Sequence, residues 1–262
     1  MPIPLPIAAF FVFHWVSSVF FQTFYLHRYG AHRMFVMSRG WERFFHLCTY
    51  VCQGSSFLNP RGYAILHRMH HAYSDTEKDP HSPRVSGDPM TMMNRTRDIY
   101  RSINAGTFPV EARFDGGYPS WPALDRFGSR WLSSVLWGAA YTTFYLVFAT
   151  AWWQFLLLPA HYFMGPIHGA IVNWYGHRLG YRNFDQDDDS KNTLVFDFVT
   201  CGELFQNNHH RYGARPNFAV KWFEVDPAWV AIWVFSKLGI LQIRSETKRN
   251  SDEAALALSP AE

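Results

Sequence analysis

Eight of the 13 histidines in this chain fall into four groups along the sequence. The groups are His27 and His32; His67, His70 and His71; His177 alone; and His209 and His210. Side chains three and four residues apart share one face of a helix, so the His-x-x-His-His triplet would present a row of ligands. Neutral imidazole is the commonest metal ligand in proteins. This spacing therefore predicts a metal site.

The number of histidines indicates two metals, because eight imidazoles exceed the three or four ligands of one tetrahedral zinc site. Soluble carboxylate di-iron proteins use paired Glu-x-x-His motifs on bundled helices. The nearest string here, from Glu203 to Gln206, contains no histidine. We therefore expect a histidine-rich dinuclear centre, which would bind and activate dioxygen if its metal were iron. The residues by themselves leave the metal open.

The remaining histidines have a simpler interpretation. A single histidine near a membrane surface is usually an amphipathic or hydrogen-bonded side chain, and we assign that role to four of them: His14, His46, His161 and His168. A polar bundle interior or a proton pathway is the alternative explanation for the clustered histidines. We favour metal, because packing so many imidazoles together without metal would leave their hydrogen-bonding groups unused.

The charged residues leave two long gaps in the sequence. Every Lys and Arg lies within residues 28–130 or 178–249, and residues 1–27 and 131–177 contain no Lys, Arg, Asp or Glu. About 20 apolar residues cross a bilayer core. The gaps therefore predict a multi-pass membrane protein, with spans over residues 5–26, 131–150 and 152–172.

Two apolar stretches outside the gaps, residues 44–58 and 229–241, are short for a span, so we predict interfacial or re-entrant helices there. The positive-inside rule places both basic blocks in the cytoplasm and the N-terminus outside. If residues 44–58 do not cross and the last two spans form a hairpin, all four histidine groups meet on the cytoplasmic side. The acidic string at residues 185–190 is expected to be a solvated turn.

These elements predict an all-α fold. Residues 1–244 would form a membrane domain with a cytoplasmic helical cap that houses the metal site, and residues 245–262 a mobile tail. The aromatic content of 18% excludes disorder for most of the chain. Three cysteines are too few for a disulfide framework or an iron–sulfur cluster, and a net charge of +3 gives no basic excess for nucleic acid.

The histidine groups resemble the three histidine boxes of membrane fatty acyl desaturases, most closely the stearoyl-CoA (acyl-CoA) branch. The boxes are His27-x4-His32, His67-x2-His70-His71 and Gly202-Glu203 followed by His209-His210. Further similar strings are Asp79-Pro80-His81, Asn173-x3-His177, Gly180-Tyr181-Arg182, Asn192-x-Leu194-Val195 and Asp226-Pro227. The resemblance covers most of the chain, from about Thr23 to Gly239.

The resemblance implies that the eight histidines ligate a non-haem di-iron centre, with Asn173 contributing through a water. The implied reaction is oxygen-dependent removal of two hydrogens from a mid-chain position of a long acyl group, which would give a cis double bond as in delta-9 desaturation. The acyl group could be linked to CoA, a carrier protein or a lipid. No haem, flavin or iron–sulfur motif is visible, so a separate cytochrome b5 or ferredoxin type of donor would supply electrons. A bacterial inner membrane is favoured over the endoplasmic reticulum.

The sequence departs from the family pattern at two places. The last box usually begins with histidine, and here Gln206 occupies that place. A glutamine oxygen is a harder, weaker ligand than imidazole, so Gln206 would either substitute directly or hydrogen-bond a bound water. The family branch also has two spans before the first box, whereas this sequence has one.

Two other functions remain as alternatives. A membrane hydroxylase or ketolase could use the same metal centre, since the same oxidant can insert oxygen instead of removing a second hydrogen. A histidine-rich metal or proton transporter belongs to a different class. It would need polar residues at mid-bilayer depth, where the spans offer only His14, His161 and His168.

Overall fold

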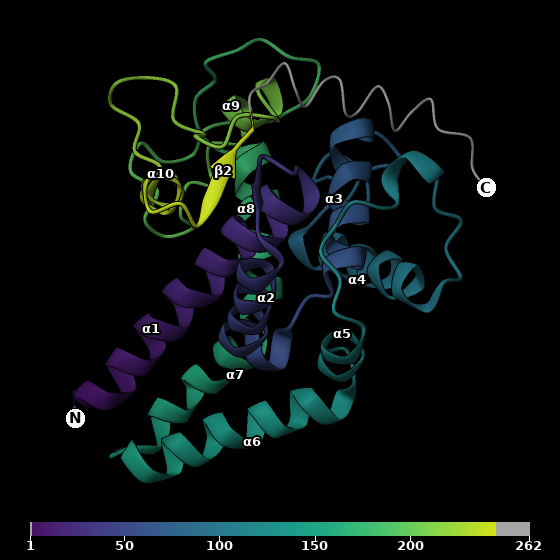
Figure 1. Cartoon of the computed structure of the whole chain (residues 1–262). Helices are drawn as coiled ribbons and strands as arrows, with labels where there is room; N and C mark the ends of the chain where they lie inside the picture. Colours follow the sequence, from purple (N-terminus) through teal and green to yellow (C-terminus); the bar gives the residue numbers. More distant parts are fainter. Residues whose placement is uncertain (1, 245–262) are drawn as a thin grey trace.

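The computed structural model describes residues 2–244, and these residues are mostly helical, as predicted (Figure 1). The predicted tail over residues 245–262 lies outside the described residues. The α-helices are α1 Leu5–Phe21, α2 Arg39–Gln53, α3 Pro60–Tyr73, α4 Pro89–Ala105, α5 Pro122–Gly128, α6 Trp131–Phe148, α7 Leu158–Tyr162, α8 Met164–Arg178, α9 Gln206–Arg211 and α10 Pro227–Lys237. One π-helix, η1 Gln22–Ala31, and three 3₁₀ turns, η2 Gly54–Ser56, η3 Ala112–Phe114 and η4 Trp152–Leu157, complete the helical elements of the described chain.

Helix α1 and the π-helix η1 form one continuous helix over Leu5–Ala31. Its 27 residues make it long and apolar enough to cross a membrane. This helix matches the predicted first span and extends it through His27, so the first histidine box lies on the last turns of the same helix. In Figure 1, α1 and α6 reach toward one end of the molecule, whereas α3 and α9 lie toward the other.

The predicted span over residues 152–172 is not a straight helix. It consists of η4, α7 and α8, and the helical axes before and after Phe163 meet at 70°. Pro166 explains the break, because its ring would clash with the carbonyl of Tyr162 in an uninterrupted helix. Pro166 instead lies in the first turn of α8, where its missing N–H costs no hydrogen bond. Within residues 2–244, the helix over Leu5–Ala31 is long and apolar enough to span a membrane. The bent pair would be a second candidate if its two parts together form one span.

Helices occur at both stretches where we predicted interfacial helices, with shifted ends. Helix α2 begins at Arg39, where the hydroxyl of Ser38 accepts a hydrogen bond from the N–H of Trp41. Helix α10 ends at Lys237, and Leu241, which we predicted to be helical, belongs to strand β2 Leu241–Ile243. Strand β2 pairs antiparallel with β1 Phe35–Met37, so the sequence-based expectation of an all-α chain misses a two-stranded sheet. Pairing of such short, distant segments leaves no local sequence pattern.

A hydrophobic core lies behind the first histidine box. It is formed by residues of η1, β1, α2, α10, β2 and the loops before and after α9. Phe24 of η1 packs on Phe35 and Phe45, and Phe205 and Phe218 complete the same cluster. The core therefore fixes the π-helix against the segments that carry the last box.

We predict that Gly54→Ala destabilises the protein by about 2–4 kcal/mol, because Gly54 has a φ of +50° and an added Cβ would lie 1.7 Å from the Tyr141 hydroxyl oxygen. Thermal unfolding in detergent, followed by tryptophan fluorescence, measures the change. Gly169→Ala is the matched control: Gly169 lies in α8 and an added Cβ there meets no atom within 4 Å, so this variant should unfold at the same or a higher temperature. Equal unfolding temperatures for Gly54→Ala and the parent would contradict the packing described here.

Candidate metal centre

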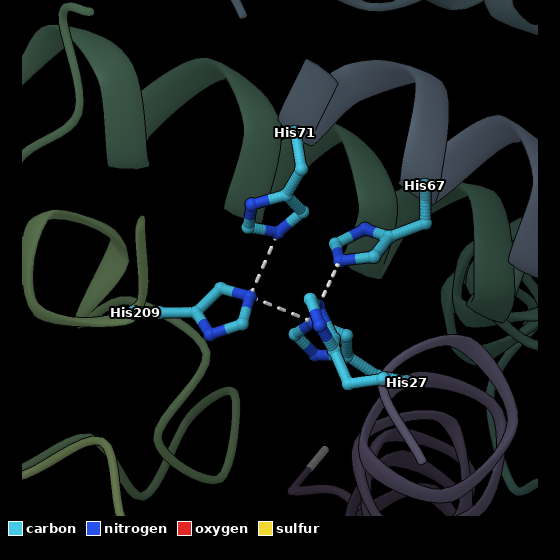
Figure 2. A group of neighbouring side chains, drawn as sticks. His27, His67, His71 and His209 are labelled. Carbon is cyan, nitrogen blue, oxygen red and sulfur yellow. Dashed lines mark hydrogen bonds between the residues drawn. The ribbon is translucent and has the colours of Figure 1, made fainter. Parts of the chain in front are cut away.

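The structure brings all eight predicted histidines together in two groups. The first histidine group is His27, His32, His67, His71 and His209, and the second histidine group is His70, His177 and His210. Within each group the candidate ligand nitrogens all lie within 4.8 Å of one another. Figure 2 shows His67 and His71 directed from α3 toward the rings of His27 and His209.

Helix α3 divides its triplet between the two groups. Asn59 caps the start of α3 by accepting hydrogen bonds from the N–H groups of Arg61 and Gly62. From this start, His67 and His71, four residues apart, face the first group, while His70 faces the second. Helix α9 likewise contributes His209 to the first group and His210 to the second.

The π-helix accounts for the spacing of the first box. In a π-helix each N–H bonds to the carbonyl five residues earlier. The N–H of His32 donates to the carbonyl of His27 at 3.0 Å, so both side chains come to one side of the chain. A regular α-helix repeats every 3.6 residues and would point residues five apart in different directions.

A glycine turn leads into the last box. Gly202 has a φ of +93°, and a Cβ at this position would lie 2.3 Å from the Asp226 Oδ1. Asp226 is also held by the buried guanidinium of Arg28, at 3.0 Å. Only glycine fits this close approach, so Gly202 allows the chain to enter α9 beside η1.

The Nε2 atoms of the first histidine group converge. His27 and His71 each place Nε2 close to the Nε2 of His209, at 3.0 Å and 2.9 Å, and the Nε2 atoms of His32 and His67 are 2.7 Å apart. One proton can join two imidazole nitrogens, but His209 cannot share its single Nε2 position equally with two partners. A cation at the centre of the group would satisfy all of these nitrogens together.

Four carboxylates hold the opposite ring nitrogens. The Nδ1–carboxylate distances are 2.6 Å for His27–Glu203, 2.9 Å for His70–Asp79, 3.0 Å for His177–Asp75 and 2.7 Å for His210–Asp188. A carboxylate that accepts the Nδ1 proton fixes the ring orientation and leaves the Nε2 lone pair for a metal. The arrangement is the one that metal-binding histidines usually have.

The second histidine group fits a metal by the same reasoning. Because the Nδ1 atoms of His70 and His210 donate to carboxylates, their Nε2 atoms carry lone pairs, and these face each other at 3.2 Å. The Nε2 of His177 is buried and has no hydrogen-bond partner among the described residues. Three nitrogens that converge in this way could hold a metal ion, and imidazole suits iron as well as zinc, copper and nickel.

Three histidines of the first group are held in the neutral form that can bind a metal. Burial, together with the charges of neighbouring histidines, holds the pKa values of His67, His71 and His209 well below their usual range. These imidazoles are therefore neutral near pH 7, as a metal ligand must be. Burial alone would raise the pKa of Asp79, but the hydrogen bonds from the Nδ1 of His70 and the N–H of His81 bring it below its usual range, so the carboxylate stays ionised.

Gln206 and Asn173, which we expected to act directly or through a water, have different surroundings. The buried side chain of Gln206 lies over Gly176, where an added Cβ would be 2.5 Å from its Cγ, and its amide nitrogen donates to the carbonyl of Glu203 at 2.7 Å. This places Gln206 next to His177 of the second group. Asn173 lies four residues before His177 on α8 and is half-buried.

Sequence reasoning missed the roles of the carboxylates, although Asp79 and Glu203 stand in strings that resemble the family. The string at residues 185–190 is not a freely solvated turn, because Asp188 binds His210 and the N–H of Asp189 donates to Asp75. Their acidic character was visible, but two of the four histidine partners lie more than a hundred residues away from their carboxylates. His46 pairs with Asp125 at 2.7 Å, away from both groups, which agrees with its predicted hydrogen-bonded role.

A model of the fatty acid desaturase family matches residues 2–242. The chain belongs to this family. It is therefore an oxidoreductase of the desaturase type, and the family is membrane-associated. The desaturase is 27% identical to an sn-1 stearoyl-lipid 9-desaturase of Anabaena variabilis, over 87% of this chain and 79% of that protein.

Two further relatives act on other acyl carriers by name. The desaturase is 25% identical to a hex-5-enoyl-[acyl-carrier protein] acetylenase of Moorena producens, over 87% of this chain and 73% of that protein. It is 26% identical to an acyl-CoA C20 Delta5-desaturase of Anemone leveillei, over 88% of this chain and 70% of that protein. The matches confirm the family that the histidine boxes predicted.

We predict that Asp79→Asn weakens metal binding at the second histidine group by about 10–100-fold, because the amide no longer orients His70 or increases its basicity. Titration of the metal-free protein with Co²⁺, followed by absorption, should resolve one weakened and one unchanged site. Asp125→Asn is the matched control, since it alters the same kind of carboxylate–imidazole pair outside both groups. An unchanged titration of Asp79→Asn would show that the carboxylate does not tune the site.

Proposed function

We propose that this desaturase introduces a mid-chain cis double bond into a long-chain fatty acyl group, using dioxygen and two non-haem iron ions. The observation that carries the proposal is the convergence of eight imidazoles in two groups, with four carboxylates behind them. The first histidine group would hold one iron and the second histidine group the other. The family generally depends on non-haem iron, which supports this choice of metal.

Bound iron would supply the strong oxidant that breaking an unactivated methylene C–H bond requires. The protein's own residues have other tasks. Glu203 accepts a hydrogen bond from the hydroxyl of Thr23 and lies against the Nδ1 of His27, so it fixes this ring on η1. The ring of Tyr63 stacks on that of His67, with 6.0 Å between centroids. These contacts hold the ligand rings in position before any metal or substrate binds.

The second histidine group has one imidazole fewer than the family pattern provides. We propose that Gln206 acts through a water and does not replace that ligand directly: its amide nitrogen donates to the carbonyl of Glu203, and its amide oxygen is left to accept a hydrogen bond. Its place over Gly176 instead suits a hydrogen bond to a water at the second iron. Asn173, one helical turn before His177, would act in the same way through a water.

The relatives support the substrate class. The names of two of them, from Anabaena variabilis and Synechocystis, specify a 9-desaturase acting on stearoyl lipid. We infer a delta-9-like position on a chain of similar length. The relatives' names include lipid, acyl-carrier-protein and CoA substrates, so each of these three carriers is a candidate.

Electrons would come from a separate protein of the cytochrome b5 or ferredoxin type. The three cysteines of the described chain are unpaired and sit on α2 and in the loop before α9, so they do not form a cluster site. No region of the sequence has a haem- or flavin-binding motif. The donor would approach the side of the molecule that bears the histidines.

Exposed apolar stripes support a multi-pass membrane topology with interfacial helices. On α2 the exposed residues Trp41, Phe44 and Val51 recur along one face, and on α10 Val230, Trp233 and Val234 do the same. Such amphipathic helices lie in the headgroup region of a bilayer. With α1, α6 and the bent α7–α8 pair in the membrane, the histidine groups would face the cytoplasm, and we infer a bacterial inner membrane.

We predict that the iron-loaded wild-type protein in lipid nanodiscs contains about two irons per chain and forms an unsaturated product two mass units lighter than its acyl substrate. His71→Ala and His210→Ala each remove one ligand from a different group, so each should lower iron content and abolish desaturation while membrane insertion persists. Iron analysis and mass spectrometry of the lipids measure both effects.

His46→Gln provides the control, because it alters a buried histidine outside both groups and keeps a donor for Asp125. This variant should retain its iron and its product. Full activity in His71→Ala would refute the metal assignment, and a product that gained an oxygen would identify a hydroxylase instead.

A further inference from the structure

Helix α1 carries a line of buried polar side chains that leads to the first histidine group. His14, Ser18 and Gln22 are spaced by four residues, and their exposed fractions are 4%, 0% and 9%. Four residues of helix rise about 6 Å, so one polar group occurs at each turn. Gln22 begins the π-helix, where a five-residue repeat places it on the same side as His27.

Two helices that contact α1 carry further buried polar side chains. Gln53 lies at the end of α2, and His168 lies on α8, where its ring meets the edge of Trp15 at 4.5 Å. Both side chains are at most 1% exposed. We refer to His14, Ser18, Gln22, Gln53 and His168 together as the polar row.

The atoms of the polar row lack partners. Among the described residues, no hydrogen-bond partner exists for the Nε2 of His14, the Oγ of Ser18, the Oε1 of Gln22, the Nε2 of Gln53, or either ring nitrogen of His168. At the far end, by contrast, His14 and His161 share a 2.7 Å contact between their Nδ1 atoms, and His161 binds the hydroxyl of Tyr145 at 3.0 Å. The unpartnered atoms of Ser18 and Gln22 therefore lie, along the helix, between the His14–His161 network and the metal centre.

Unpartnered polar atoms are costly in this setting. Each buried donor or acceptor without a partner costs about 1–3 kcal/mol, and no bulk water reaches the apolar part of a bilayer. Buried polar groups are normally satisfied by protein or by bound water. The polar row holds an amide oxygen that needs a donor, an amide nitrogen that needs an acceptor, and imidazole and hydroxyl groups that can be either.

We propose that the polar row is a binding site for hydroxyl groups, which both donate and accept hydrogen bonds. Two sources offer this chemistry. Ordered water molecules would connect the His14–His161 network to His27, and desaturation with dioxygen takes up protons and releases water beside that residue. Alternatively, a hydroxyl carried on the acyl chain would occupy the row. The role in turnover rests on the proposed desaturase function, whereas the binding of hydroxyl groups does not.

The test uses iron-loaded protein in lipid nanodiscs and three variants of the row: Ser18→Ala, Gln22→Leu and His168→Phe. Unfolding temperature, iron content, and turnover of a plain and a hydroxylated acyl substrate are measured for each. Ser17→Ala is the matched control, because the Ser17 hydroxyl already donates to the carbonyl of His14 at 3.4 Å. It should behave as the wild type in all four measurements.

Bound water predicts that the row variants keep their iron, unfold at the same or a lower temperature, and lose about tenfold or more of turnover on both substrates. A substrate hydroxyl predicts that only turnover of the hydroxylated substrate falls. Higher unfolding temperatures with unchanged turnover would overturn the proposal, because removing a polar atom that has no partner stabilises a protein.

The two proposals fail in different ways. Wild-type protein that holds iron but desaturates neither substrate would refute the proposed function, and the unfolding temperatures would still decide whether the row binds hydroxyl groups. Should His168→Phe fail to fold, Ser18→Ala removes a single oxygen atom and carries the same test.

Discussion

The orientation of the imidazole rings is the constraint on which the rest of this structure depends. Eight rings must direct nitrogen lone pairs at two points, and such lone pairs repel one another until a cation binds. Carboxylates that hold Nδ1, as Asp79 holds His70 and Asp188 holds His210, supply part of the force that maintains this geometry. The backbone also constrains the rings. The ligands on α3, α8 and α9 lie near the ends of these helices, and His27 lies in the π-helix η1.

The C-terminal segment supports the site from behind. Arg28, next to His27, is fully buried, pairs with Asp226 at 3.0 Å, and lies over the ring of Phe218 at 3.9 Å. Phe218 also contacts the ring of His209, with 4.3 Å between centroids. A buried ion pair is costly to form but costlier to break, because the remaining charge would be left unpaired. The α10 segment is thereby tied to ligands from both ends of the chain.

Local spacing explains which parts of the site could be predicted. His67, His70 and His71 are recognisable because one helix carries them, and the two charge-free gaps mark apolar segments directly. The pairing of His177 with Asp75 could not be predicted from the sequence, because 102 residues separate them and any acidic residue could have been the partner. The bend at Phe163 depends on where Pro166 falls within its helix, and the pairing of β1 with β2 depends on tertiary packing.

The π-helix η1 links the local spacing of the ligands to the tertiary packing of the core. An α-helix through residues 22–31 would rotate His32 away from His27, and the first histidine group would lose a ligand. The wider turn keeps the five-residue spacing in register, but it is less stable than an α-helix and persists only where packing compensates. Phe24 and Leu26, both buried in the core beside α2 and α10, provide that packing. The apolar core and the metal site therefore depend on the same ten residues of backbone.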